Sequence, residues 1–342
     1  MSFYRLSVCV ALLLVLGCSD PPETEPTEPA IPEPPAGSLL ADPLVPFPEL
    51  LSETGLFPFA PDLSRVPSMV HGYAPAWPLW SNGLGKSRHL AIPKGAAVDT
   101  SDRAAWRFPL GTLFFKTFSD DERHIETRVL RLGNDGWEFA AYRWNDDGAD
   151  ANKLDLKMGV MVDVTTDGAA LEHRIPNLLD CRQCHEASPS QVLGFDELRL
   201  NHGVDGEQSE LERIFEEGVL AGSMPVDPVE VTDADPIARE VRGYLHGNCS
   251  NCHNGWTGES SSFDMRHAVA LENTVGKPTE SSASAPGIRI VPGSPEDSIL
   301  FLAFSGETDD PEVKAMPPVG IERRDPEAVE LLRGFITSLP TR

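Results

Sequence analysis

Two five-residue frames in the second half of the chain carry recognisable chemistry. Residues 181–185 (CRQCH) and residues 249–253 (CSNCH) both have the form C-x-x-C-H. Two thiols at this spacing can bond to the two vinyl groups of one haem, and the adjacent histidine can bind the iron. The sequence therefore predicts two covalently bound haem c groups. Their expected attachment sites are Cys181, Cys184, Cys249 and Cys252, and their expected iron ligands are His185 and His253.

Paired cysteines have two other common uses. A structural zinc site would need both pairs, but the histidine after each pair would then be redundant and the interval between the pairs is far longer than in zinc ribbons. A disulfide or thiol redox centre is the other use, but no thioredoxin-like βαβ pattern surrounds either frame. The two C-x-x-C-H frames therefore favour haem attachment over a zinc site or a thiol redox centre.

Each haem iron can take a sixth ligand, and the sequence offers candidates. For the haem at His253, Met316 stands in AMPPVG, where two prolines would stiffen the loop. For the haem at His185, Met224 in GSMP is the first candidate, because it follows a helical pattern and precedes Pro225. His202, His173 or an open position are the alternatives at this haem.

Helical signals surround both frames. Ser209 with Glu212, and Ser294 with Asp297, have the spacing of capping boxes before apolar runs. Asp325 followed by Pro326 predicts the start of a last helix. We therefore expect a mainly α region with a first haem module over 177–235 and a second module over 236–342.

The chain before these modules has a β pattern. Apolar runs at 112–118, 124–132 and 137–144 are separated by turn clusters, and the segments 158–164 and 171–175 continue the pattern. Residues 49–176 are therefore expected to form an antiparallel β-rich domain, which makes the chain an α+β multidomain protein. The charged strand residues Lys116, Glu126 and Arg128 could line a site, although a solvated sheet face is the more common explanation.

The N-terminus reads as an export signal. Arg5 precedes an apolar run over 6–16 that is too short to span a bilayer, and Gly17 stands before Cys18. VLGC at this point resembles the lipobox of bacterial lipoproteins, which implies a signal peptide over 1–17 and a lipid on Cys18. An ordinary signal peptide is the alternative. Residues 18–48 are rich in Pro and Glu and are expected to form an extended linker.

The charge balance restricts the partners. Lys and Arg number 28 against 53 Asp and Glu, so the formal net charge is −25. Such a charge repels phosphate backbones and anionic headgroups, which disfavours nucleic-acid binding and a polybasic membrane contact. Lipid on Cys18 is then the expected tether to a bacterial membrane, on the periplasmic side.

From about residue 50 to the end, the chain resembles a family of exported bacterial diheme c-type cytochromes. The resemblance is carried by the segments LSETGLF, PLWSNG, FPLGTLFFKTF, CRQCH with LGFDELRLN, YLHGNCSNCH, and IVPGSPEDSIL with MPP. The loop at Met316 also resembles the distal loop of class I cytochromes c. The family implies electron transfer with haem c and redox protein partners, and it gives no substrate.

We therefore expect a lipid-anchored diheme cytochrome c that carries out one-electron transfer. One alternative is a diheme peroxidase-like oxidoreductase in which one haem has an open coordination position. Another is a β domain that binds a ligand or partner and is served by the haems. The spin state of each ferric haem would distinguish the first two.

Overall fold

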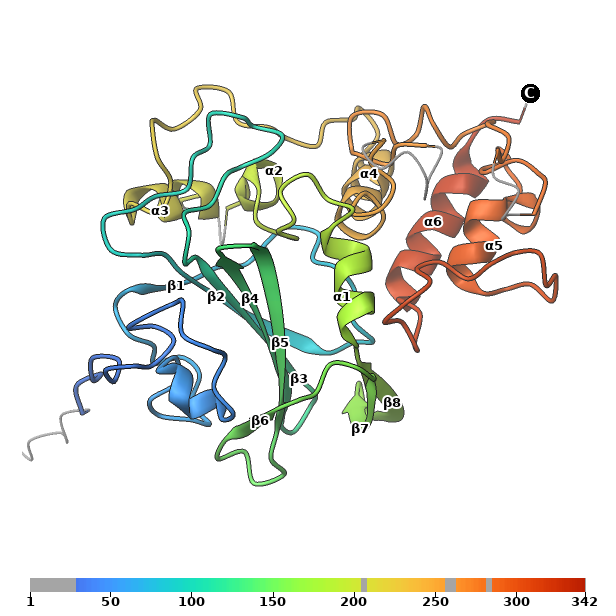
Figure 1. The fold of residues 1–342 in the computed structure, drawn as a ribbon. Coiled ribbons are helices and arrows are strands. Elements are labelled where there is room, and N and C mark those ends of the chain that lie inside the picture. Colours follow the sequence, from blue (N-terminus) through green and yellow to red (C-terminus); the bar gives the residue numbers. More distant parts are fainter. Residues whose placement is uncertain (1–28, 204–207, 256–262, 281–284, 342) are drawn as a thin grey trace, which may run out of the picture. The chain divides into compact units, whose positions relative to one another are not determined.

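A computed structural model describes residues 29–203, 208–255, 263–280 and 285–341 (Figure 1). Pro32–Arg342 form one compact unit, and Met1–Ile31 form a separate one. The predicted signal peptide and Cys18 lie outside the described residues. No helix of the described ranges combines the length and the apolar character needed to cross a membrane.

An antiparallel sheet occupies the first half of the compact unit. Among the described residues its six strands lie in chain order, each paired with the next (Figure 1). The strands are β1 (Val70–Gly72), β2 (Gly85–Ala91), β3 (Leu113–Ser119), β4 (His124–Gly133), β5 (Gly136–Trp144) and β6 (Ala151–Lys153). Strands β7 (Val160–Thr166) and β8 (Ala169–Ile175) form a separate hairpin. The predicted antiparallel β-rich region is confirmed.

Both faces of the six-stranded sheet are covered. Phe115 and Tyr142 on one face pack with Leu39 and with Leu51 of a short 3-10 helix, η1 (Leu51–Thr54). Leu39, in the predicted extended linker, is thus buried against the sheet. On the other face, apolar side chains such as Phe114 and Leu130 pack with Phe195, Leu211 and Ile214. Burial of each such side chain contributes roughly 1.5–3 kcal/mol.

The remaining elements are helical. They are α1 (Leu178–His185), α2 (Glu197–Leu200), α3 (Glu210–Glu216), α4 (Pro236–Asn248), η2 (Pro295–Asp297), α5 (Ile299–Ser305) and α6 (Pro326–Ser338). The Ser209 box is confirmed, because Ser209 Oγ accepts from the Glu212 N–H at 3.1 Å. The Asp325 cap is confirmed too, with the Ala328 N–H donating at 3.2 Å. At Ser294 the prediction differs, because a single 3-10 turn follows it and α5 begins only after Ser298.

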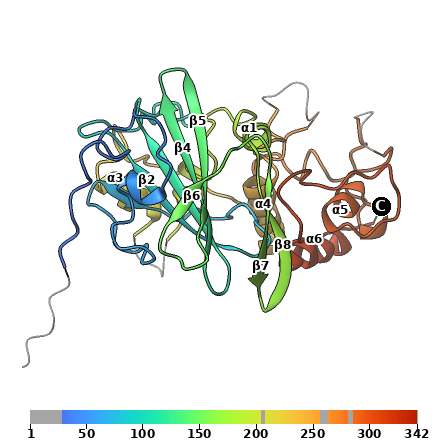
Figure 2. The same cartoon turned by 60° about the horizontal axis from the view of Figure 1, so that its bottom comes forward.

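Helices α4, α5 and α6 enclose a separate apolar core. Helix α6 packs against both α4 and α5, and the end of the chain runs along the same region (Figure 2). Val241, Leu245, Phe301, Phe335 and Ile336 are buried there. This core holds the second C-x-x-C-H frame against the end of α4.

The segment between β1 and β2 joins the sheet to α4. Trp77 lies on the helix so closely that a Cβ at Gly243 would come within 2.1 Å of its ring, and one at Gly247 would meet its carbonyl oxygen at the same distance. The Trp80 N–H donates to Asn248 Oδ1 at 2.7 Å. Glycine is thus required at these two helix positions because the sheet's connecting segment packs directly on the backbone.

Candidate functional site

A cavity of about 440 Å³ lies beside the second frame. Cys249 caps α4, and Cys249, Cys252 and His253 all line the cavity. Most of its wall is apolar, with Leu245, Phe263, Phe304 and Leu332 among the lining residues. This volume falls in the range of protein cofactor sites.

His253 presents an unpartnered ring nitrogen at this cavity. Within the described part of the chain, its buried Nδ1 has no hydrogen-bond partner. Burial, assisted by the charge of Arg289, lowers the pKa of His253 to about 4. The imidazole is therefore neutral near pH 7, which is the form that binds iron.

Arg289 places a cation in the cavity wall. Its guanidinium lies over the Phe263 ring at 4.1 Å, and Nη1 donates to the Asn273 carbonyl at 2.8 Å. Among the described residues, buried Nη2 makes no hydrogen bond, and it forms an ion pair with Glu280 Oε2 at 3.7 Å. An acidic group of a ligand would satisfy it.

Met316 lines the same cavity, as predicted for an iron ligand of this frame. It lies in the loop between α5 and α6, with its N–H donating to the Ala303 carbonyl at 2.9 Å. Arg324 Nη1 donates to the Met316 carbonyl at 2.7 Å. Its side chain is 38% exposed, so these backbone bonds rather than close packing fix the residue.

The β region holds the chain just after Met316. Asn82 is fully buried with φ +58°, and its Oδ1 accepts from the Glu322 N–H at 2.9 Å and from the Arg323 N–H at 3.0 Å. Its Nδ2 donates to Glu322 Oε2 at 2.5 Å. Trp80 Nε1 adds a bond to the Arg323 carbonyl at 2.7 Å. The PLWSNG stretch therefore fixes the far end of the Met316 loop.

The first frame lies on helix α1. Asn177 and Asp180 form its capping box, and Cys181, Cys184 and His185 follow within the helix. His185 Nδ1 donates to the Gln191 carbonyl at 2.7 Å, which leaves Nε2 available for a metal. Burial lowers the pKa of His185 to about 4, so this imidazole is neutral as well.

The two frames meet in space. The thiols of Cys184 and Cys252 are hydrogen-bonded to each other, and this bond, with burial, raises the pKa of Cys184. Asn254 Nδ2 donates to the Ala187 carbonyl at 2.8 Å, which links the segments that follow the two frames. The two C-x-x-C-H frames, far apart in the sequence, thus lie side by side.

The pKa is raised for three of the four cysteines, whereas the hydrogen bond with Cys184 lowers that of Cys252. Burial raises the pKa of Cys181 to about 11 and that of Cys249 to about 12, which disfavours the thiolate that zinc and redox chemistry require. None of the described cysteines, Cys181, Cys184, Cys249 and Cys252, is joined in a disulfide. In the described ranges, no three Cys, His, Asp or Glu side chains gather as a metal site.

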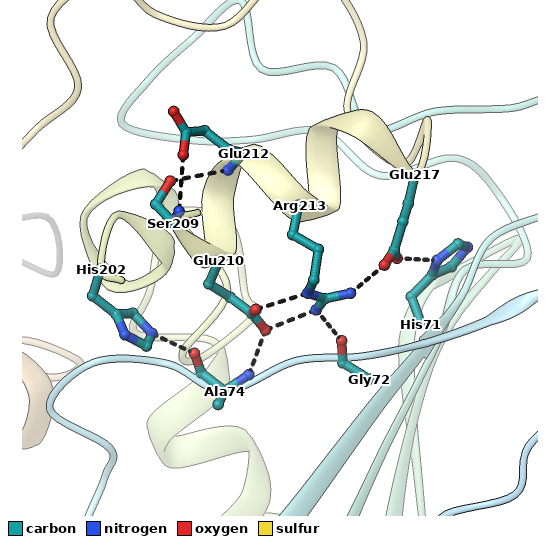
Figure 3. A network of polar contacts seen from close by, with 9 residues as sticks. All are labelled: His71, Gly72, Ala74, His202, Ser209, Glu210, Glu212, Arg213 and Glu217. Carbon is teal, nitrogen blue, oxygen red and sulfur yellow. Dashed lines mark hydrogen bonds and ion pairs between the residues drawn. The ribbon is translucent and has the colours of Figure 1, made fainter. Parts of the chain in front are cut away.

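Two of the alternative ligands for the first haem are bound elsewhere. His173 is buried, with Nδ1 at 3.1 Å from Asn82 Nδ2 and Nε2 at 2.9 Å from Glu126 Oε1. His202 Nε2 donates to the Ala74 carbonyl at 2.7 Å (Figure 3). Met224 packs in the same apolar cluster as Phe139, whose ring is 5.1 Å from that of His185. Met224 therefore stays the leading prediction for this position.

The charged groups around His202 connect helix α3 to strand β1. Arg213 Nε donates to Glu210 at 2.9 Å, and its other guanidinium nitrogens reach Glu217 and the Gly72 carbonyl (Figure 3). His71 Nδ1 lies 2.6 Å from Glu217. These groups satisfy one another and fasten α3 to the edge strand β1.

The charged strand residues do not lie on a solvated face. Glu126 is fully buried and accepts from Arg128 Nε at 2.9 Å and Nη2 at 2.5 Å. Burial by itself would raise the pKa of Glu126, but Arg128 and His173 lower it to about 2. The solvated-face explanation is therefore wrong, because this part of the sheet lies against the first frame.

Family models, curated proteins and solved structures gave no match to this chain. The functional argument depends on the geometry of the two frames and the cavity. Sequence reasoning missed Arg289, which has no motif around it, and gave no role to Asn82 although it noted the PLWSNG stretch. The glycines at 243 and 247, one helical turn apart, were the available signal for close packing on α4.

Proposed function

We propose that this protein is an exported diheme cytochrome c that carries out one-electron transfer. The observation that carries the proposal is the meeting of the two C-x-x-C-H frames at Cys184 and Cys252, with His253 and Met316 lining one cavity. In a zinc site made from both cysteine pairs, the histidine after each pair would be redundant.

The second frame has the groups that a haem c needs. Cys249 and Cys252 would hold it covalently, His253 and Met316 would bind the iron, and Arg289 would meet an acidic edge. When bound, haem c supplies reversible one-electron iron chemistry, and His/Met ligation raises its potential. The apolar cavity wall excludes water from the reacting centre.

The first frame supports attachment but leaves one ligand undecided. Cys181 and Cys184 would hold the haem, and His185 presents Nε2 because Nδ1 is bound to Gln191. Met224 is the proposed sixth ligand. Since His173 and His202 are held by other hydrogen bonds, loss of Met224 as a ligand would leave an open iron, and the chain would then be a diheme peroxidase-like oxidoreductase.

Contact between the frames gives electrons a short internal route. Cys184 and Cys252, the second cysteines of their frames, are hydrogen-bonded to each other and would each hold one haem. An electron received at one frame can then leave from the other, which suits a carrier between two redox proteins. The proposed location is the periplasmic side of a bacterial membrane, with lipid on Cys18 as the anchor.

Electron paramagnetic resonance of the oxidised protein tests this proposal against the peroxidase-like alternative. Two low-spin ferric signals are expected for a carrier whose haems both have two protein ligands. A high-spin signal that disappears in a Cys181→Ala, Cys184→Ala variant would locate an open iron at the first frame, and hydrogen peroxide turnover would then favour the enzyme.

A further inference from the structure

A buried series of polar side chains runs from the sheet to the loop that holds Met316. Glu126 on β4 and Asn82 are fully buried, and His173 on β8 is 1% exposed. His173 lies between the other two, with Nε2 at 2.9 Å from Glu126 Oε1 and Nδ1 at 3.1 Å from Asn82 Nδ2. At such burial each polar atom needs a hydrogen-bond partner of the correct kind.

Backbone groups fix the orientation of the Asn82 side chain. Its Oδ1 accepts from the N–H groups of Glu322 and Arg323 at 2.9 and 3.0 Å, and a backbone N–H can only donate. The Nδ2 group of Asn82 therefore faces His173, and this group also can only donate. His173 Nδ1 must then accept the hydrogen bond, so it carries no proton.

The other ring nitrogen of His173 faces a carboxylate. Burial by itself would raise the pKa of Glu126, but Arg128 and His173 lower it to about 2. An ionised carboxylate can only accept, so His173 Nε2 must carry the proton. The Glu126 side and the Asn82 side thus require the same neutral tautomer of His173, with Nε2 protonated and Nδ1 unprotonated.

The segment that Asn82 binds reaches Met316. Arg324, the next residue after Arg323, donates through Nη1 to the Met316 carbonyl at 2.7 Å. The side chain and the carbonyl of Arg323 are held by other groups, whereas its N–H is bound by Asn82. The position of the Glu322 and Arg323 N–H groups therefore reports how well Asn82 is oriented.

We propose that His173 is a positioning residue for Met316, because it fixes the Asn82 side chain in the orientation that binds Glu322 and Arg323. Without an acceptor at Nδ1, Asn82 Nδ2 would lose one of its two partners in a fully buried position, which is unfavourable. The role of Met316 as an iron ligand rests on the proposed function, whereas the effect of His173 on the loop does not.

Two variants of the full chain separate the two ring nitrogens. His173→Asn places an oxygen near the position of Nδ1, so it keeps an acceptor for Asn82 and loses the bond to Glu126. His173→Gln reaches the position of Nε2, so it keeps a donor for Glu126 and loses the acceptor for Asn82. Asn is the smaller side chain, so a role in packing alone would make His173→Asn the more damaging variant.

Hydrogen-deuterium exchange, read by mass spectrometry on peptides that cover Glu322 and Arg323, follows the loop independently of haem. In His173→Gln these two backbone amides should exchange about tenfold faster than in the wild type, which corresponds to about 1.4 kcal/mol. In His173→Asn they should exchange at about the wild-type rate. Under the proposed function, His173→Gln should also lose the far-red band of Met-ligated haem at a lower urea concentration than His173→Asn.

Equal exchange in the two variants, or faster exchange in His173→Asn, would overturn the positioning role of His173. The expected exchange rates in a chain whose wild type has no far-red band would support that role and would exclude Met316 as an iron ligand. If either variant does not fold, nitrogen-15 magnetic resonance of labelled histidine in the wild type decides. His173 protonated only at Nε2 would support the proposal, and His173 protonated at Nδ1 would overturn it.

Discussion

Asn82 controls the position of the Met316 loop, and its replacement by alanine should release that loop. The side chain makes hydrogen bonds from the sheet region to Glu322 and Arg323, at the far end of the loop that holds Met316. Asn82→Ala removes all of them and places alanine at φ +58°. The expected result is loss of Met316 as a ligand under conditions in which the wild-type ligand stays bound.

The magnitude follows from the groups left without partners. Each of the two hydrogen bonds to a backbone N–H contributes about 0.5–1.5 kcal/mol, and loss of the bond to the Glu322 carboxylate costs a further 1.5–3 kcal/mol. A left-handed backbone adds about 1 kcal/mol for alanine. Since such terms are not additive, we expect a total of about 3–5 kcal/mol. Each 1.4 kcal/mol is tenfold, so the loop should open at least a hundredfold more often.

The assay follows the weak far-red charge-transfer band of Met-ligated ferric haem during urea titration, beside the far-ultraviolet circular dichroism of the whole chain. Asn82→Ala should lose the band well before the fold unfolds. Thr117→Val is the control, because it breaks one buried hydrogen bond of 2.7 Å to Thr127 on the sheet's other face. The reasoning is refuted if both variants lose the band at the same urea concentration, or if Asn82→Ala loses the band at the same urea midpoint as the wild type.

Three further outcomes are expected. Met316→His should abolish the second haem's share of the far-red band and lower the potential of that haem. A residual band that disappears only when Met224 is also replaced would assign Met224 to the first haem. An unchanged band would exclude Met316 as an iron ligand. Cys18→Ser should move the protein from the membrane fraction to the soluble exported fraction, and continued tight membrane binding would contradict the lipid anchor. The pKa of Glu126, about 2 in the folded protein against an ordinary 4.5, stabilises the fold above pH 4.5, and this stability is lost as the pH falls toward 2. Glu126→Gln should remove about 3 kcal/mol of this pH dependence from the free energy of unfolding measured in urea. An unfolding free energy with the same pH profile as the wild type would show that the carboxylate is not the cause.

The sequence was informative where local pattern alone decides the structure. The runs that became β3, β4 and β5 alternate or carry aromatic and β-branched residues, and the caps at Ser209 and Asp325 bond to the predicted turns. Strand β2 was missed because Lys86 and Arg88 point into a covered face, where the usual alternation of apolar and polar residues does not apply. Charged residues on a strand normally indicate solvent, and here tertiary packing overrides that pattern.

The sequence predicts a chemistry for the two frames, but it does not predict their arrangement. The spacing of each C-x-x-C-H frame predicts haem attachment and an iron-binding histidine without reference to the fold. No local pattern shows that Cys184 lies against Cys252 or that Asn82 reaches Glu322, because these contacts depend on how the sheet and the helices pack. The sequence likewise does not show that His173 and His202 make other hydrogen bonds, which disfavour them as iron ligands.

A count of covalent haem per chain tests the central claim most directly. The pyridine haemochrome assay on the purified full chain should give two haems per polypeptide. It should give one for the Cys181→Ala, Cys184→Ala variant and one for the matched Cys249→Ala, Cys252→Ala variant, because each frame binds its own haem. A wild-type chain without covalent haem, or a double variant that keeps the wild-type count, would contradict the account.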